Sequence, residues 1–428
     1  MRRYRWGVAD RLLSVEDSRR GETRYSYTPT GQLERAEYPD GRERWRKSDQ
    51  TGNLYPDPDM KLRRYLGGGR LEQDGEWHCE YDADGNLTER YLGTGRWLDG
   101  KKDRWRYRWN ADGSLAKVVR PDKREVEFTY DALGRRLSKS FGTTVTRWVW
   151  NGNVPLHQWK QHREYSVMEN RWNTDTERRD MTVWLFDEDS FVPVAMIKEG
   201  RSYSILTDQL GTPTEAYDAE GNEVWSRVLD MDGNVIEETG NKGMVPFLFQ
   251  GQYYDRETGL AYNRFRYYSP KMGMYVSQDP IGLGGGILNL YGYVDDTNAW
   301  IDVFGLRGKE SFPSWMKRRK GFERHHIIPY HLKDHPIIVE SGININGAIN
   351  MIFLPRYESN HPTKMIHRHF RIGNEHHSAY DKEIEIELYK LSTQARLEKW
   401  NPEMMRQKIL QLQHKKRRQL NNRNSYKK

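Results

Sequence analysis

The sequence contains a single cysteine, Cys79, among its 428 residues. One thiol has no partner within the chain, so a framework of internal disulfides is excluded and stability must come from packing. Long apolar runs are missing as well, since no stretch approaches the roughly 18 apolar residues that a membrane-spanning helix needs. The first residues, MRRYRWGVADRLLSVEDSRRGE, are interrupted by charges before the apolar region of a secretory signal could form.

Hydrophobic residues make up only 36% of the chain, and charged residues make up 30%. A composition this polar is close to that of disordered chains, but 15 Trp, 26 Tyr and 12 Phe supply large side chains that can be buried. The length corresponds to two or three domains of ordinary size. The composition therefore predicts a polar, aromatic and folded protein.

The net charge of +8 is distributed unevenly along the chain. Residues 1–306 carry 44 Lys and Arg against 49 Asp and Glu, whereas residues 307–428 carry 25 against 12, a net charge of +13. Ten of the 13 histidines follow Leu306, and 13 of the 15 tryptophans precede it. The division indicates two chemically different parts, of which only the second is strongly basic.

A short theme recurs in the first part. An aromatic residue ends one segment, Asp, Asn or Thr begins a turn that contains Gly, and an apolar residue two or three positions after the Gly restores alternation, which is typical of a β-hairpin. The theme occurs as YTPTGQLER at 27–35, YDADGNLTERY at 81–91, WNADGSLAKVV at 109–119, YDALGRRLSKS at 130–140 and YDAEGNEVW at 217–225. Such spacing predicts an array of hairpins that pack against their neighbours.

These repeats resemble the YD repeats of the RHS family. The segments DQLGTPTEAYDAEGNEVW at 208–225 and FQGQYYDRETGLAYNRFRYYSPKMGMYVSQDPIGL at 249–283 are similar to the end of RHS cores. The resemblance covers most of residues 20–306 and implies a β-shell that encloses a C-terminal toxin. The repeat aromatics are expected to build hairpins, although exposed Trp and Tyr could also stack on sugars.

The segment DPIGLGGGILNLYGYVDDTNAWIDVFGL at 279–306 resembles the RHS junction, which in that family cuts its own chain after the final Leu, here Leu306. Aspartyl proteolysis requires two carboxylates close enough to share a proton. The resemblance assigns this role to Asp279 and Asp302, with Asp255 as a third candidate. Val303 stands where the family has Pro, and the alternative is that the aspartates only cap turns.

The basic part is predicted to contain a strand at 322–328, a helical piece at 331–340, a strand at 350–354 and two C-terminal helices. Ser378 and Asp381 form a capping pair, which predicts that His376 and His377 lie just before the first helix. Neutral imidazoles suit a divalent transition metal, and histidine's ordinary pKa suits a general base. Since His325 and His326 are adjacent on a strand, one would be a ligand and the other a base.

The pattern HHIIPYHL, GININGAINMIFLP and HHSAYDKEI resembles the AHH group of HNH nucleases, whose core is a ββα-metal fold, over about residues 320–395. The resemblance implies that His325 and His377 are metal ligands, with His367 as the third, and His369 close behind it. It makes His326 the general base and Asn350 the brace of the loop that holds the base. His326 could instead be a packed strand residue and Asn350 a turn cap.

Nucleic-acid backbone would be bound by basic side chains. The candidates are Arg324, Lys364, Arg368, Lys415, Lys416, Arg417 and Arg418. The last four belong to the run HKKRRQ at 414–419, which could equally be a solvated helix end. His331, His335, His361 and His414 are expected to be solvated bystanders.

The fold class predicted is a mainly β YD-repeat shell followed by a small α+β domain with a ββα-metal core. The predicted domains are a hairpin array at 1–248, a junction at 249–306, a basic linker at 307–321 and a nuclease domain at 322–428. The predicted function is that of an RHS toxin whose tip hydrolyses DNA with a divalent metal ion, Mg²⁺, Zn²⁺ or Ni²⁺. The alternatives are an RNase of the same fold or a surface-binding RHS protein with an inactive tip.

The RHS resemblance also implies partners and a place of action. We expect an acidic immunity protein in the producing cell and a specialised secretion system that exports the chain without a cleavable signal peptide. The toxin would be made in the cytoplasm of one cell and act in the cytoplasm of a competing bacterium.

Overall fold

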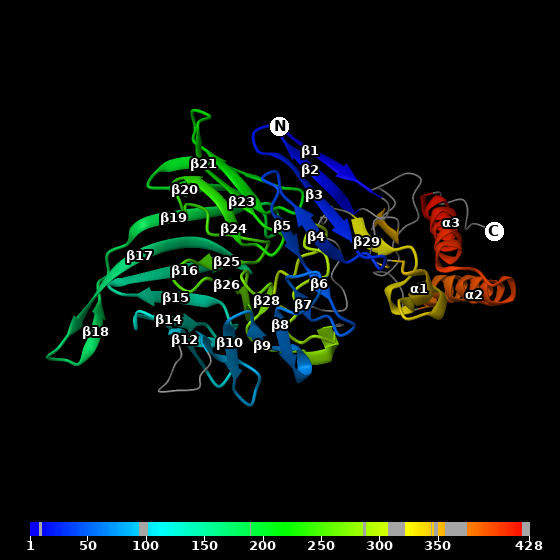
Figure 1. Ribbon diagram of the computed structural model, residues 1–428. Helices are drawn as coiled ribbons and strands as arrows, with labels where there is room; N and C mark the ends of the chain where they lie inside the picture. Colours follow the sequence, from blue (N-terminus) through cyan, green and yellow to red (C-terminus); the bar gives the residue numbers. More distant parts are fainter. Residues whose placement is uncertain are drawn as a thin grey trace. The chain divides into compact units, whose positions relative to one another are not determined.

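Repeated hairpins dominate the computed structural model of the chain (Figure 1). The structure describes residues 1–7, 11–93, 102–188, 190–285, 288–306, 322–343, 345, 350–355 and 375–421. Within these ranges, the description excludes the side chains of residues 284, 285, 322–324, 351, 353, 355, 375–379, 414 and 421. Contacts divide the chain into two units, one of Met1–Leu33, Glu37–Gly41 and Phe312–Lys428, the other of Glu34–Ala36 and Arg42–Ser311.

The hairpin array of the second unit is a closed barrel in which neighbouring strands are mostly consecutive in sequence and antiparallel. Its strands are β8 (Arg63–Leu66), β9 (Arg70–Asp74), β10 (Trp77–Tyr81), β11 (Leu87–Leu92), β12 (Lys102–Trp109), β13 (Leu115–Val119), β14 (Glu125–Tyr130), β15 (Arg136–Phe141), β16 (Thr144–Asn151), β17 (Val154–Ser166), β18 (Arg171–Thr174), β19 (Arg179–Phe186), β20 (Pro193–Lys198), β21 (Arg201–Thr207), β22 (Pro213–Tyr217), β23 (Glu223–Leu229) and β24 (Val235–Gly240). This confirms the predicted β-hairpin array.

Each of the five recurring sequences forms the expected turn. In YDADGN, the amide of Asp82 donates to the carbonyl of Asn86 at 3.0 Å, and Gly85 adopts a φ of 78° that favours glycine. Gly85 also has no room for a side chain, since a Cβ there would lie 2.0 Å from Nε2 of Gln278. Gly85 therefore allows both the tight turn and the close approach of the junction.

A four-stranded sheet from the junction fills the barrel. It consists of β25 (Tyr253–Asp255), β26 (Leu260–Asn263), β27 (Arg266–Ser269) and β28 (Met274–Tyr275). Its side chains Tyr262, Tyr267 and Met274 share one buried cluster with Leu87 and Trp148 of the barrel wall. The predicted shell thus has an aromatic plug, and Figure 1 shows the outer strands curving around β25, β26 and β28.

Seven short strands begin the chain. They are β1 (Arg2–Trp6), β2 (Leu12–Asp17), β3 (Gly21–Tyr27), β4 (Leu33–Glu37), β5 (Glu43–Trp45), β6 (Lys47–Ser48) and β7 (Leu54–Tyr55). In the first unit, β1 pairs with β2 and β2 with β3, all antiparallel.

The C-terminal part of the first unit has the predicted α+β composition. Its elements are β29 (Phe322–His326), α1 (Pro336–Ser341), β30 (Met351–Pro355), α2 (Glu375–Glu398) and α3 (Pro402–Asn421). β29 and β30 form an antiparallel pair, and Ile337, Ile384, Leu388 and Ile409 bring the three helices into one core. No helix among the described residues is both long and apolar enough to cross a membrane.

Candidate functional site

The two junction aspartates lie on either side of one arginine in the second unit. Arg266 of β27 has its Nη2 3.1 Å from Oδ2 of Asp279 and 3.3 Å from Oδ2 of Asp302. All three side chains are buried. The fold therefore brings together two carboxylates that are 23 positions apart in the sequence.

Burial raises the pKa of Asp302, and the neighbouring Asp279 adds to this rise. Arg266 acts against it, as does the hydroxyl of Tyr275, which donates to Oδ2 of Asp302 at 2.9 Å. The amide of Leu306 donates to the other carboxylate oxygen, Oδ1, at 3.0 Å. Burial thus shifts the titration of Asp302 toward higher pH, and this carboxyl touches Leu306, the residue of the expected cleavage point.

Three hydrogen bonds fix the segment of residues 302–306. Nδ2 of Asn263 donates to the carbonyl of Asp302 at 2.7 Å, the amide of Phe265 donates to the carbonyl of Phe304 at 3.1 Å, and Nε of Arg266 donates to the carbonyl of Gly305. β26, β27 and the residues between them therefore fix this segment against the carboxylates.

Asp255, the third candidate, belongs to a different cluster. It is fully buried, with Oδ1 3.0 Å from Nζ of Lys139 and Oδ2 beside the guanidinium of Arg136. Asp279 also accepts the amide of Ile281 at 3.0 Å, so it caps a turn in addition to facing Arg266. Turn capping and pairing with Asp302 are therefore compatible.

The paired histidines close strand β29 in the first unit. His325 is 8% exposed, and its ring meets that of Tyr380 of α2 edge-on at 5.6 Å between centroids. The ring of His326 instead lies 5.7 Å from that of Tyr330. Successive strand residues point to opposite faces, so the two imidazoles have separate surroundings.

Asn350 is fully buried, and its hydrogen bonds connect the residues that follow His326 with those that precede β30. Its Nδ2 donates to the carbonyls of Ile328 at 2.9 Å and Ile345 at 2.6 Å, and its Oδ1 accepts the amide of Ile328 at 2.7 Å. Its backbone carbonyl accepts the amide of Ile327 at 2.6 Å. The side chain thus braces residues 327 and 328, directly after the histidine pair.

The predicted start of the first C-terminal helix is wrong by one turn. α2 begins at Glu375, so His376 and His377 lie within its first turn rather than before it. Asp381, expected to pair with Ser378 as a cap, has Oδ2 3.9 Å from Nδ1 of His331. The hydroxyl of Tyr380 donates to the carbonyl of Ile327 at 2.6 Å, which fixes the start of α2 near the end of β29.

Several predicted site residues lie outside the described residues. His367, Lys364 and Arg368 are among them, and the side chains of His377 and Arg324 are too, although their backbones belong to α2 and β29. Within the part of the chain that the structure describes, no group of three or more His, Cys, Asp or Glu forms a cluster suited to a metal ion. His325 supplies one buried imidazole donor, and imidazole is a suitable ligand for a divalent transition metal.

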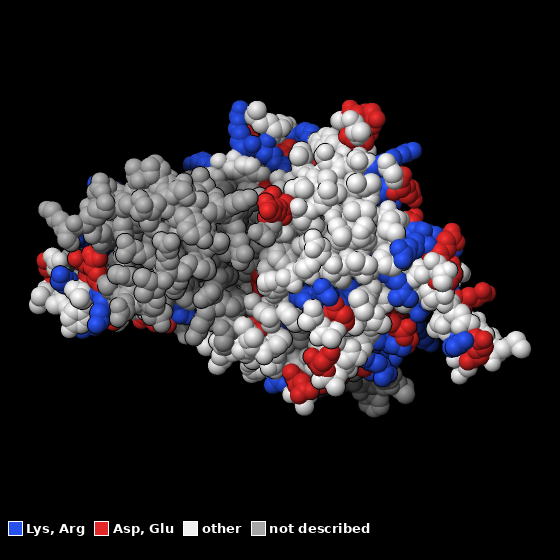
Figure 2. Space-filling model, turned by 180° about the vertical axis from the view of Figure 1, so that it is seen from behind, with Lys and Arg blue, Asp and Glu red and all other residues white. Residues whose placement is uncertain are grey.

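The basic run of α3 separates into two kinds of side chain. Lys415 and Arg418 are exposed and Arg417 is half-buried, whereas Lys416 is 1% exposed and forms an ion pair with Glu383 of α2. The ammonium group of Lys416 therefore pairs within the protein, between α3 and α2. On the face seen in Figure 2, Lys and Arg alternate with Asp and Glu over the coloured part of the surface.

Two residues with contacts to the candidate sites were missed in the sequence. Arg266 could have been noticed in the motif NRFRYY, because an arginine between aromatics is a common buried cation. Gln413 of α3 donates from Nε2 to Oδ1 of Asn350 at 3.1 Å. No local pattern marks Gln413, since its partner lies 63 residues away.

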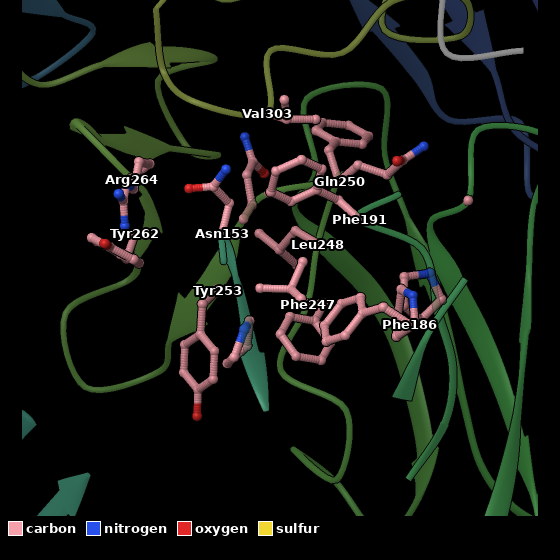
Figure 3. Close-up of a pocket in the computed structure, with 18 of the residues that line it drawn as sticks. Asn153, Phe186, Phe191, Phe247, Leu248, Gln250, Tyr253, Tyr262, Arg264 and Val303 are labelled. Carbon is pink, nitrogen blue, oxygen red and sulfur yellow. The ribbon is translucent and has the colours of Figure 1, made fainter. Parts of the chain in front are cut away.

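A pocket lies within the second unit (Figure 3). Phe186, Phe191 and Phe247 line it, and Val303 of the junction contributes to its edge. Phe191 also meets Phe304 edge-on at 5.5 Å. Since the pocket contains none of the candidate catalytic side chains, its aromatic wall supports the junction rather than forming either candidate site.

Comparison with known families matches both parts of the chain. The family model of the teneurin YD-shell matches residues 8–284, and that of a nuclease family of the HNH/ENDO VII superfamily with conserved AHH matches residues 309–416. The chain belongs to the teneurin YD-shell family and carries an AHH-type domain at its C-terminal side. The resemblance to YD-repeat proteins with an AHH domain and the predicted fold class are thereby confirmed.

Similar proteins include bacterial toxins. The chain is 33% identical over 331 residues to double-stranded DNA deaminase toxin A of Burkholderia cenocepacia (strain H111), covering 72% of this chain and 22% of that protein. It is 29% identical over 247 residues to the probable deoxyribonuclease RhsA of Dickeya dadantii (strain 3937), covering 56% and 16%. The chain thus spans less than a quarter of the length of these relatives.

Among solved structures, the crystal structure of TcdB2-TccC3-TEV is similar, with a TM-score of 0.43 and 15% identity. The similarity covers 71% of this chain and 18% of that one.

Proposed function

We propose that this chain is an RHS-type toxin whose C-terminal domain is an endonuclease that hydrolyses phosphodiester bonds of DNA with a divalent metal ion. The bracing of the chain after His326 by Asn350 carries this proposal. A simple turn does not require a fully buried side-chain amide with four hydrogen bonds. Such an amide suits a site whose base must be held in place. The match to an AHH nuclease family over residues 309–416 supports the same reading.

In the proposed reaction, an imidazole nitrogen of His326 takes a proton from water. The resulting hydroxide attacks phosphorus, and the bond to the 3′ oxygen breaks, leaving a 5′ phosphate and a 3′ hydroxyl once that oxygen has gained a proton. His325 and His377, with His367 as the third ligand, would hold a divalent metal ion, which supplies stabilisation of negative charge on the phosphate and the leaving oxygen. Asn350 keeps His326 at a fixed position relative to His325.

Basic side chains would hold the nucleic-acid backbone without reading its sequence. Lys415, Arg417 and Arg418 of α3 remain candidates for this role, together with Arg324, Lys364 and Arg368. Lys416 is left out because its ammonium group pairs with Glu383.

We also propose that the chain cuts itself after Leu306, which would release the C-terminal domain. One carboxyl of Asp279 and Asp302 would activate water, and the other would protonate the leaving amide nitrogen. The contact of Asp302 with the amide of Leu306 at 3.0 Å and the raised pKa of Asp302 support this assignment. Mass spectrometry of the purified chain should find a fragment that ends at Leu306, and the fragment should be absent from the Asp302→Asn variant.

We also propose the domain boundaries that the sequence suggests, 1–248, 249–306, 307–321 and 322–428. The toxin would leave the producing cell through a specialised secretion system, without a cleavable signal peptide, and act in the cytoplasm of a competitor. An acidic immunity protein would protect the producer by covering the basic domain.

A plasmid assay tests the central proposal. The full chain is made by cell-free synthesis and incubated with supercoiled plasmid or total RNA, in EDTA or with Mg²⁺, Zn²⁺ or Ni²⁺. We expect plasmid cleavage that requires a divalent ion. Intact plasmid beside degraded RNA would establish the RNase alternative, and two intact substrates under all conditions would contradict nuclease activity and favour a surface-binding role.

A further inference from the structure

The last helix, α3, reaches the braced asparagine of the candidate nuclease site. Gln413 is 1% exposed and donates from Nε2 to Oδ1 of Asn350 at 3.1 Å. The orientation of the Asn350 amide is fixed by backbone groups, because its Oδ1 faces the amide of Ile328 while its Nδ2 faces the carbonyls of Ile328 and Ile345. The atom of Gln413 that meets Oδ1 must therefore be its donor, Nε2.

This contact completes the hydrogen bonding of Asn350. The side-chain amide has two donor hydrogens and two acceptor lone pairs, and the four partners are the carbonyls of Ile328 and Ile345, the amide of Ile328 and Gln413. Three of these contacts come from the chain next to the histidine pair or β30. Only Gln413 comes from a helix outside the ββα core of β29, β30 and α2.

Of the two polar atoms in the Gln413 side chain, Nε2 has a partner in Asn350, and Oε1 does not have one among the described residues. Oε1 is also buried. A buried acceptor without a partner is unfavourable, and packing alone would favour an apolar side chain such as Met at this position. A glutamine at this position departs from that rule, and such departures are typical of residues that take part in a functional site.

We infer that Gln413 is a positioning residue of the nuclease site, which acts through Asn350 on the chain that carries His326. The inference rests on the proposed function, since it assigns to α3 a part in that same site. Loss of the donor leaves one lone pair of Asn350 empty and weakens the brace on Ile327 and Ile328. The proton-accepting nitrogen of His326 then spends less time where it can reach water, while phosphate contacts on other side chains are unaffected.

The test compares Gln413→Met and Gln413→Glu with the full-length wild-type chain in the plasmid assay. Gln413→Met keeps the length of the side chain but removes the donor, and it should lower kcat about 10–100-fold with KM for DNA unchanged, in the range seen for residues that support metal sites. Gln413→Glu should be as impaired at neutral pH and recover relative to wild type as the pH falls, because the protonated carboxyl donates to Asn350 again.

A matched control separates positioning from packing. Ile409→Val removes one methylene group from a fully buried residue one turn earlier in α3, without touching either amide. It should lower the melting temperature but leave kcat and the pH profile of the folded protein unchanged. Wild-type kcat in folded Gln413→Met, or a drop shared equally with Ile409→Val, would overturn the inference. An inactive wild-type chain would instead overturn the proposed nuclease function.

Discussion

Adjacent histidines on one strand end can carry different roles because a strand sends them to different neighbours. His325 packs against Tyr380 of α2, and His326 lies near Tyr330. Tyr380 in turn holds the carbonyl of Ile327, so the helix whose first turn contains His376 and His377 is tied to the strand that ends with His325 and His326. The proposed metal ligand, His325, and the proposed base, His326, are thus neighbours in sequence that lie on different faces of the strand.

The His326→Ala variant tests the base directly. General bases contribute about 10²–10⁴-fold to rates, so plasmid cleavage should fall by at least about 100-fold while the protein remains folded. His331→Ala is the matched control, because the His331 side chain is 59% exposed and is expected to be a bystander. Equal activity of His326→Ala and His331→Ala would remove His326 from the mechanism.

Self-cleavage at the junction should depend on pH in a direction set by Asp302. In the proposed reaction the protonated form of Asp302 gives a proton to the leaving nitrogen. Because burial raises the pKa of this carboxyl, that form is lost as the pH rises through the raised value. The appearance of the fragment ending at Leu306 should therefore be faster in mildly acidic than in neutral buffer. A rate that increases toward neutral pH would contradict a protonated Asp302.

At the scale of elements, one turn of the array brings two carboxylates close enough to repel each other. In the sequence DMDGN at 230–234, burial raises the pKa of Asp230 to about 6, and Asp232 adds to the rise while Arg44 opposes it. The carboxylate of Asp230 accepts the amides of Asp232 and Asn234, both at 2.9 Å. These backbone contacts hold the turn although the two carboxylates repel each other.

The sign of this shift predicts how stability changes with pH. Because the folded pKa of Asp230 exceeds its ordinary value, its contribution to stability is complete below about pH 4 and is lost as the pH rises to about 6. The loss is on the order of 2–3 kcal/mol. Asp230→Asn keeps an acceptor for the two amides, so its unfolding midpoint in urea should vary less between pH 4 and 7 than that of wild type. An identical pH profile would contradict the assignment.

Local elements could be predicted from the sequence and distant pairings could not. Each hairpin turn depends on about five consecutive residues, such as 82–86, so its signal is complete within the repeat. Closure of the barrel depends on the order of 17 strands, which no single repeat encodes. The start of α2 was missed because capping sequences favour a helix end without preventing one more turn.

The same difference applies to the candidate sites. Asp279, Asp302, His325, His326 and Asn350 lie in motifs that could be picked out by their residue types. Partners from distant segments could not, since Arg266 lies 36 residues from Asp302 and Gln413 lies 63 residues from Asn350. Lys416 was chosen with its basic neighbours because one position in a charged run cannot be distinguished until the helix face that packs is known.

At the scale of the whole molecule, charge is separated along the chain. The last 122 residues carry a net charge of +13 and the first 306 carry −5. The attraction to a polyanion should therefore come from the C-terminal domain, with the repeat array contributing little or opposing it. DNA binding can be measured apart from cleavage, so the contribution of each part of the chain can be tested.

Binding of the full chain to a DNA duplex in EDTA, measured by fluorescence anisotropy, should weaken linearly on a plot of log affinity against log salt concentration. Each phosphate contact adds about 0.9 to the magnitude of the slope.

Replacing all three of Lys415, Arg417 and Arg418 by Gln should lower the magnitude of the slope by about 2–3 if these side chains contact phosphates. Replacing Lys160, Arg171 and Arg179 of the array with Gln changes the net charge equally and should leave the slope unchanged. All three control side chains are exposed by at least 41%. If both triple variants lower the slope to the same extent, binding follows overall charge, and α3 is no specific phosphate surface.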